Sequence, residues 1–186
     1  IHEEAPFRSG RICSEEEDLT LLNWAKELGC NYVRLAHYPH NEKMVRLAEK
    51  MGLMVWSEIP VYWTIQWENE GTYQNAHNQL MEMIERDQNR AAVIIWSIAN
   101  ETPHGDARDR FLSNLAKAAR EKDNSRLLSM AMERSDKSAT VLSIQDRMSE
   151  YVDIISCNQY LGWYDGLNEK IDRVRWEVDY EKPLVF

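Results

Sequence analysis

The stretch Ala92-Val93-Ile94-Ile95-Trp96-Ser97-Ile98-Ala99-Asn100-Glu101 decides the fold. Residues 92–98 are apolar almost without alternation, which is typical of a strand buried on both faces. Such strands belong to parallel sheets covered by helices. Two polar residues, Asn100 and Glu101, follow directly. The stretch therefore predicts an α/β fold with functional groups at the end of a central strand.

Helix and strand signals alternate along the rest of the chain. Ser14 and Glu17 form a capping box at the start of a helix that ends at Gly29. Repeated strand–helix units predict a parallel sheet. We expect further helices at 41–51, 74–87, 106–122 and 167–178, an aromatic-rich loop at 59–73, and strands at 31–36, 53–56, 127–132, 153–157 and 183–186, with one more strand ending at His2.

Two architectures fit this order, an open doubly wound sheet and a closed barrel. The chain has no GxGxxG or GxxxxGK[ST] loop, which weakens the nucleotide-binding form of the open sheet. A complete barrel has eight strands and typically ~250 residues. We therefore expect residues 1–186 to form one domain, an incomplete (β/α)8 TIM barrel with about strands 1 to 7.

Composition excludes several classes of function. The net charge of −9 argues against nucleic-acid binding, which needs basic patches. The longest apolar runs, such as 91–95, are far too short to cross a membrane. The three cysteines, Cys13, Cys30 and Cys157, lack metal-ligand spacing, so we expect free thiols, no metal and no cofactor. Seven tryptophans and eight tyrosines suit a cleft that binds a carbohydrate partner.

Polar side chains gather where the expected strands end. Functional groups of parallel α/β folds lie at the carboxyl ends of the strands, and these ends share one rim. A single His or Glu in such a place is more often structural, but five such ends together indicate a site. The candidates at this rim are His2, Arg34, His37, Glu58, Asn100, Glu101, Asn158 and Tyr160.

Glu101 is the sharpest of these candidates. Cleavage of a glycoside needs a carboxylic acid that donates a proton to the leaving oxygen. Burial behind a strand of Val and Ile residues is expected to raise the pKa of Glu101 and keep it protonated. Asn100 is placed to hydrogen-bond a sugar hydroxyl beside the reacting carbon.

Two long patterns resemble the signatures of glycoside hydrolase family 2. One comprises residues 31–39, Asn-Tyr-Val-Arg-Leu-Ala-His-Tyr-Pro, and residues 51–60, Met-Gly-Leu-Met-Val-Trp-Ser-Glu-Ile-Pro. The other comprises Asp87-Gln88-Asn89-Arg90 and Val93 to Glu101, which is similar to the acid/base signature of that family. The resemblance covers essentially the whole chain, and His2-Glu3 is similar to the end of the first barrel strand.

The resemblance implies roles for individual residues. Glu101 would be the general acid/base of a retaining β-glycosidase, and Asn100 would bind the sugar hydroxyl next to the anomeric carbon. His37 and Arg34 would lie at the floor and wall of the pocket. The segment Asn158-Gln159-Tyr160-Leu161-Gly162-Trp163-Tyr164 is most similar to the β-glucuronidase branch. It would place Tyr160, Trp163 and Tyr164 near the sugar.

One part of the family pattern is not matched. The nucleophilic Glu of the family follows a stretch like Lys182-Pro183-Leu184-Val185-Phe186, so it is expected within a few residues past Phe186. The last barrel strand and the N-terminal β-sandwich domains are likewise expected outside residues 1–186. We therefore expect this polypeptide alone to have negligible activity, and its exposed sheet edges to favour poor stability or a homo-oligomer.

Three alternatives stay open at this point. In the first, the chain belongs to a β-galactosidase or a β-mannosidase instead of a β-glucuronidase. In the second, the chain is a non-catalytic barrel remnant that binds carbohydrate; the intact acid/base signature argues against this. The third is a plain structural α/β module.

Overall fold

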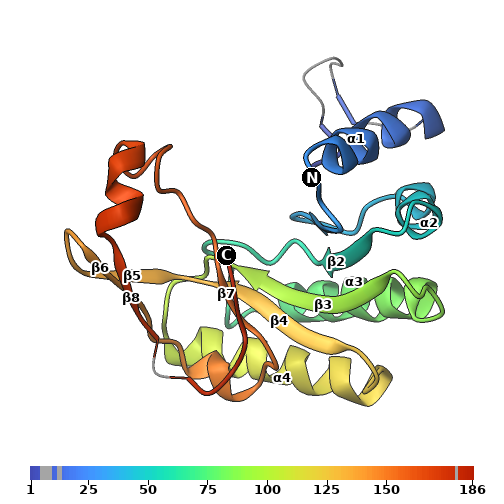
Figure 1. The fold of residues 1–186 in the computed structure, drawn as a ribbon. Coiled ribbons are helices and arrows are strands. Elements are labelled where there is room, and N and C mark those ends of the chain that lie inside the picture. The colour runs from blue at the N-terminus through green and yellow to red at the C-terminus, as the bar shows by residue number, and fades with distance from the viewer. Residues whose placement is uncertain (5–9, 12–13, 179) are drawn as a thin grey trace.

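The parallel strands curl into part of a barrel in the computed structural model (Figure 1). The structure describes residues 1–4, 10–11, 14–178 and 180–186. The helices are α1 (Glu15–Glu27), α2 (Glu42–Lys50), α3 (Glu70–Asp87) and α4 (Asp106–Lys122), with 3-10 helices η1 (Arg147–Glu150) and η2 (Asn168–Arg173). The strands are β1 (Tyr32–Leu35), β2 (Met54–Glu58), β3 (Val93–Asn100), β4 (Leu127–Met132), β5 (Arg134–Ser138), β6 (Val141–Ile144), β7 (Ile155–Cys157), β8 (Arg175–Glu177) and β9 (Leu184–Val185).

The main sheet has six strands in the order β1-β2-β3-β4-β7-β9. Every neighbouring pair is parallel, as the strand–helix alternation predicts. The strands thus form an incomplete α/β barrel, as the sequence predicts. All carboxyl ends of these strands lie at one rim of the sheet, which brings residues far apart in the sequence together.

The sequence predicts a strand that ends at His2. In the part of the chain that the structure describes, Ile1 alone represents this strand. The Ile1 amino group donates to Arg34 O at 2.7 Å, and Ala36 N donates to Ile1 O at 3.0 Å. These two bonds are the pairing of a parallel ladder. Ile1 therefore continues the sheet order beyond β1, and His2 follows at the rim.

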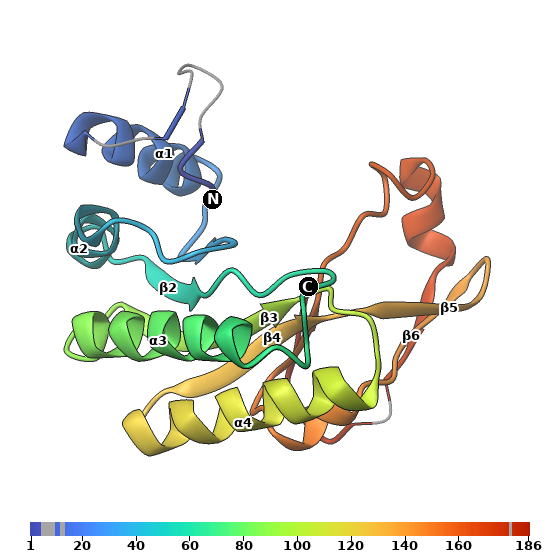
Figure 2. The same ribbon diagram turned by 180° about the vertical axis from the view of Figure 1, so that it is seen from behind.

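Helices cover the outer face of the sheet. From behind, α3 and α4 run side by side along β3 and β4 (Figure 2). The large core lies between these helices and the strands and includes Leu80, Ile84, Leu112 and Leu115. A smaller cluster on the opposite face contains Trp56, Ile95 and Ile154. Successive residues of a strand point to opposite faces, so the near-continuous apolar runs fill both.

A second sheet, of strands β5, β6 and β8, projects beyond the rim (Figure 1). Its hairpin of β5 and β6 is antiparallel, and β6 pairs with β8 in parallel. This hairpin was not predicted from the sequence. The single helix expected over 167–178 is wrong, because η2 ends at Arg173 and Arg175 N then donates to Thr140 O at 2.8 Å at the start of β8.

Candidate active site

Backbone hydrogen bonds hold Asn100 and Glu101 from both sides. Asn100 N donates to Val61 O at 2.8 Å, and Trp63 N donates to Asn100 O at 3.1 Å. On the other side, Glu101 N donates to Ala131 O at 2.8 Å. Glu101 has a φ of 46°, a left-handed conformation that non-glycine residues rarely adopt. Such strain persists only where the surrounding structure fixes it, and it is common in functional sites.

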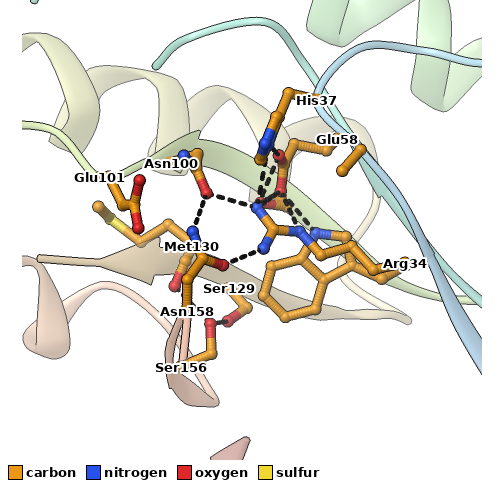
Figure 3. A network of polar contacts seen from close by, with 12 residues as sticks. Arg34, His37, Glu58, Asn100, Glu101, Ser129, Met130, Ser156 and Asn158 are labelled. Carbon is orange, nitrogen blue, oxygen red and sulfur yellow. Dashed lines mark hydrogen bonds and ion pairs between the residues drawn. The ribbon is translucent and has the colours of Figure 1, made fainter. Parts of the chain in front are cut away.

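Glu58 lies beneath the site, and its side chain is fully buried. Its carboxylate accepts hydrogen bonds from Arg34 Nη2 and Trp56 Nε1, each at 2.8 Å (Figure 3). Ser97 Oγ donates at 2.8 Å, and His37 Nδ1 lies 2.8 Å away. Burial raises the pKa of Glu58, but the contacts from His37, Arg34 and Ser97 outweigh it and hold the pKa below its ordinary value. These contacts therefore favour the anionic form of Glu58 beneath the pocket.

Arg34 links Glu58 to the side-chain amides of Asn100 and Asn158 at the rim. Arg34 Nη1 donates to Asn158 Oδ1 at 2.5 Å, and Arg34 Nη2 donates to Asn100 Oδ1 at 2.7 Å (Figure 3). Asn158 Nδ2 also donates to Asn100 Oδ1, at 2.9 Å. The oxygen of Asn100 is thus held by protein donors. Its amide nitrogen remains as the group that can face a substrate hydroxyl.

The Glu101 carboxyl is half-buried and accepts from two sides. Tyr160 Oη donates to Oε1 at 2.5 Å, and Trp63 Nε1 donates to Oε2 at 3.3 Å. Burial raises the pKa of Glu101, but hydrogen bonds from Tyr160, Asn158 and Trp63 together hold it below its ordinary value. The sequence-based expectation of a raised pKa is therefore wrong for this structure. Burial and the contact with Glu101 raise the pKa of Tyr160 to about 12.

A cavity of about 700 Å³ opens at this rim. Every site residue predicted from the sequence lines it except Glu58, which lies beneath: His2, Arg34, His37, Asn100, Glu101, Asn158, Tyr160, Trp163 and Tyr164. Tyr62 and Trp63 line it too, although sequence reasoning gave them no role. Their aromatic-rich loop was a visible signal, but nothing in it showed which ring turns toward the rim.

Aromatic rings dominate the mouth of the cavity. Trp163 and Tyr164 stack with ring centroids 4.1 Å apart and an angle of 18° between the planes. Tyr160 lies 5.6 Å from Tyr164, and Trp63 meets Tyr62 edge-on at 5.6 Å. Flat, exposed rings of this kind suit the apolar faces of sugars.

Other chemistry receives no support from the described residues. No group of three or more His, Cys, Asp or Glu among them is placed to hold a metal ion. Burial raises the pKa of the Cys157 thiol to about 12, and Cys30 is also a free thiol. Cys13 lies outside the described residues. A helix capable of crossing a membrane is not found in the described part of the chain.

A parallel barrel rim with an Asn–Glu pair inside an aromatic-lined cavity defines the class of barrel glycoside hydrolases. The family model for the TIM barrel domain of glycosyl hydrolases family 2 matches residues 1–186, so the chain belongs to that family.

Relatives of known sequence and structure are β-glucuronidases. The chain is 31% identical over 213 residues to that of Streptococcus agalactiae serotype V, covering 99% of this chain and 34% of the relative. It is 31% identical over 180 residues to that of Chlorocebus aethiops, covering 91% and 26%. β-Glucuronidase 3 of Bacteroides uniformis superposes with a TM-score of 0.73 at 28% identity, covering 88% of this chain and 20% of that one. The chain thus spans about a third of the length of the Streptococcus agalactiae relative and about a quarter of the length of the Chlorocebus aethiops relative.

Proposed function

We propose that this chain forms the acid/base half of the active site in a retaining β-glucuronidase. Its relatives named above are β-glucuronidases, which favours this sugar over the β-galactoside and β-mannoside alternatives. The main support for this proposal is the position of Glu101. Its carboxyl faces a 700 Å³ cavity beside Asn100, whose orientation is fixed by Arg34 and, through it, by the buried Glu58.

The proposed reaction is a double displacement. In the first step a nucleophilic carboxylate attacks the anomeric carbon, while protonated Glu101 gives its proton to the glycosidic oxygen. In the second step the Glu101 carboxylate takes a proton from water, which attacks the same carbon and releases the sugar. The Asn100 amide contributes a hydrogen bond to the neighbouring hydroxyl, which strengthens as positive charge develops on the ring.

Without substrate, the pKa of Glu101 is lowered, which suits the second step, in which Glu101 acts as a base. The first step needs the proton. A substrate that fills the cavity excludes water and raises the pKa of Glu101, as does the anionic nucleophile expected ~5–5.5 Å away. The nucleophile is an uncharged ester in the glycosyl-enzyme, so the pKa of Glu101 falls again for the second step. This change of pKa between the two steps is how one carboxyl serves as acid and then as base.

Replacing Glu101 by Gln in the enzyme that carries this chain tests the assignment. Gln cannot donate the proton, so kcat/KM for an alkyl β-glucuronide should fall by about 10²–10⁴-fold. A 2,4-dinitrophenyl β-glucuronide, whose leaving group needs little acid help, should lose far less in its first step. Azide should restore turnover and give a β-glucuronyl azide, because it attacks the intermediate without a general base.

The matched control is Glu27→Gln, which removes an exposed carboxyl at the end of α1 and should leave both rates unchanged. Equal losses on the two substrates would exclude Glu101 as the acid. Aryl β-galactosides and β-mannosides in the same assay decide the sugar: faster cleavage of either one would overturn the β-glucuronidase assignment while keeping Glu101.

A further inference from the structure

Trp63 approaches Glu101 from a neighbouring strand end. The segment 61–63 follows β2 and lies along the last residue of β3, where Tyr62 and Asn100 form a parallel bridge. The Trp63 side chain is 63% exposed, so its ring stands at the mouth of the cavity while its Nε1 reaches Oε2 of Glu101 at 3.3 Å. The loop thus delivers a hydrogen-bond donor from outside the acid/base signature.

Backbone conformation marks the same two residues. Among the residues that the structure describes, Trp63 and Glu101 are the non-glycine positions with positive φ, at 55° and 46°. An aromatic residue in this conformation is a genuine outlier, and strain of this kind is held in place by its surroundings. Their two side chains contact each other. The strained loop is therefore shaped to bring the Trp63 indole onto the acid/base.

The two oxygens of Glu101 are held unequally. Tyr160 Oη donates to Oε1 at 2.5 Å, a short contact from a half-buried group. The hydrogen bond from Trp63 Nε1 to Oε2 is 3.3 Å long, which is 0.8 Å longer than the 2.5 Å bond from Tyr160, and it comes from an exposed ring. A protonated carboxyl has one O–H donor and keeps acceptor capacity on both oxygens. The Trp63 contact is the longer and more exposed of the two, so Oε2 is the oxygen that can be protonated while Tyr160 still donates to Oε1.

We propose that Trp63 is a positioning residue for the acid/base, holding Oε2 of Glu101 toward the mouth of the cavity, where the leaving group departs. The indole N–H stabilises the carboxylate that acts on water and gives way when Oε2 is protonated for the first step. This role deepens the proposed function and rests on it for its catalytic meaning. The hydrogen bond itself can be tested without catalysis.

Other groups also lie near Glu101 and contribute to the direction in which its pKa is shifted. Tyr160 and Asn158, which follow β7, donate to it and lower its pKa, and the nearby His37 at the end of β1 lowers it through its charge. Burial and then the charge of Glu101 raise the pKa of Glu133, which follows β4, and the same charge contributes to the raised pKa of the buried Cys157 thiol. None of these groups changes when Trp63 is replaced, so the shift isolates the indole N–H.

Trp63→Phe keeps a ring at the mouth and removes the N–H donor. We expect the pKa of Glu101 to rise by about half a unit. The hydrogen bond from Trp63 is long and solvent-exposed, so it lowers the pKa less than a short, buried hydrogen bond to a carboxylate would. Glu101 must be protonated for the first step. The alkaline limb of kcat/KM for the β-glucuronide should therefore move upward by the same half unit.

The matched control is Trp67→Phe, the same change in the same loop at a ring that packs edge-on against Phe111 and not on the cavity. It should leave the limb in place. Carboxyl ¹³C NMR of Glu-labelled protein, with Glu101→Gln to assign the resonance, measures the pKa directly. An unmoved resonance in the Trp63→Phe variant overturns the role of Trp63. A shifted resonance in an enzyme that carries this chain but lacks β-glucuronidase activity supports the contact and overturns the proposed function instead.

Discussion

Glu58 has no exposed surface, yet its pKa lies below the ordinary value of 4.5. Burial opposes the charge, and the contacts from His37, Arg34 and Ser97 outweigh that penalty. Removing one partner from a buried pair costs far more than forming the pair gains, because the remaining charge is left without compensation. Glu58 therefore fixes Arg34, and with it the amides of the rim, without touching the cavity itself.

Replacing Glu58 by Gln should lower the free energy of unfolding at pH 7 by about 3 kcal/mol, at the lower end for such pairs because Arg34 is partly exposed. Since the folded pKa of Glu58 lies below 4.5, its contribution is present above that pH. It is lost as the pH falls through the folded pKa. Urea unfolding at several pH values measures this. A difference between wild type and variant that stays constant down to pH 3.5 would contradict the ion pair.

Strand-end reasoning located the polar residues of the site because all parallel strands deliver their last residues to one rim. The pKa of Glu101 could not be predicted in this way, since it depends on donors from Tyr160 and Trp63. These come from loops after β7 and β2, where no periodicity fixes the direction of a side chain. Trp63 is placed by a positive φ, which its residue type disfavours.

Asparagine caps begin both α2 and α3, but the two caps have different surroundings. Asn41 Oδ1 accepts from Met44 N at 3.0 Å, while its Nδ2 donates to the buried carboxylates of Glu3 at 3.1 Å and Asp18 at 3.2 Å. Asn69 accepts from Thr72 N at 2.9 Å in an exposed position. The first asparagine therefore joins a cap to two buried acids that need a donor.

Asn41→Ala should cost about 2–3 kcal/mol of folding free energy, because it removes a cap, one of the donors to Glu3 and the side-chain donor to Asp18 Oδ1. Asn69→Ala is the matched control and should cost about 1 kcal/mol, the usual value for a cap alone. Urea unfolding of both variants gives the comparison. Equal losses would show that Asn41 contributes only as a cap.

Two elements agree with the prediction to the residue: the helix 106–122 with α4 and the strand 127–132 with β4. The central strand, expected over 92–98, is β3 and extends to Asn100. The helix expected from residue 74 begins at Glu70, because Asn69 caps it inside the aromatic loop. The strand β8 forms only by pairing with β6, whose polar partner β5 shows no apolar alternation.

At the scale of the whole molecule, the order of strands decides where a second carboxylate can come from. β9 runs parallel to β7, so residues that follow β9 emerge at the same rim as Asn158. Among the described residues that line the cavity, Glu4 and Glu101 supply its carboxyl groups. Glu4 accepts from Tyr38 Oη at 2.5 Å, so that carboxyl is held by another partner. These positions support a nucleophile just beyond Phe186, as the family resemblance implies.

Covalent trapping with a 2-deoxy-2-fluoro-β-glucuronyl fluoride identifies that nucleophile. The 2-fluoro group slows both steps by destabilising the positively charged transition state, and the reactive fluoride lets the first step proceed, so the glycosyl-enzyme accumulates. Peptide mass spectrometry of the enzyme that carries this chain should find the label C-terminal to Phe186. The Glu101→Gln variant should be labelled as well, because fluoride needs little acid help. The polypeptide of residues 1–186 should remain unlabelled and inactive on aryl β-glucuronides. A label on Glu4, or on any carboxylate of residues 1–186, would place the nucleophile within this chain and overturn the proposed division of the site.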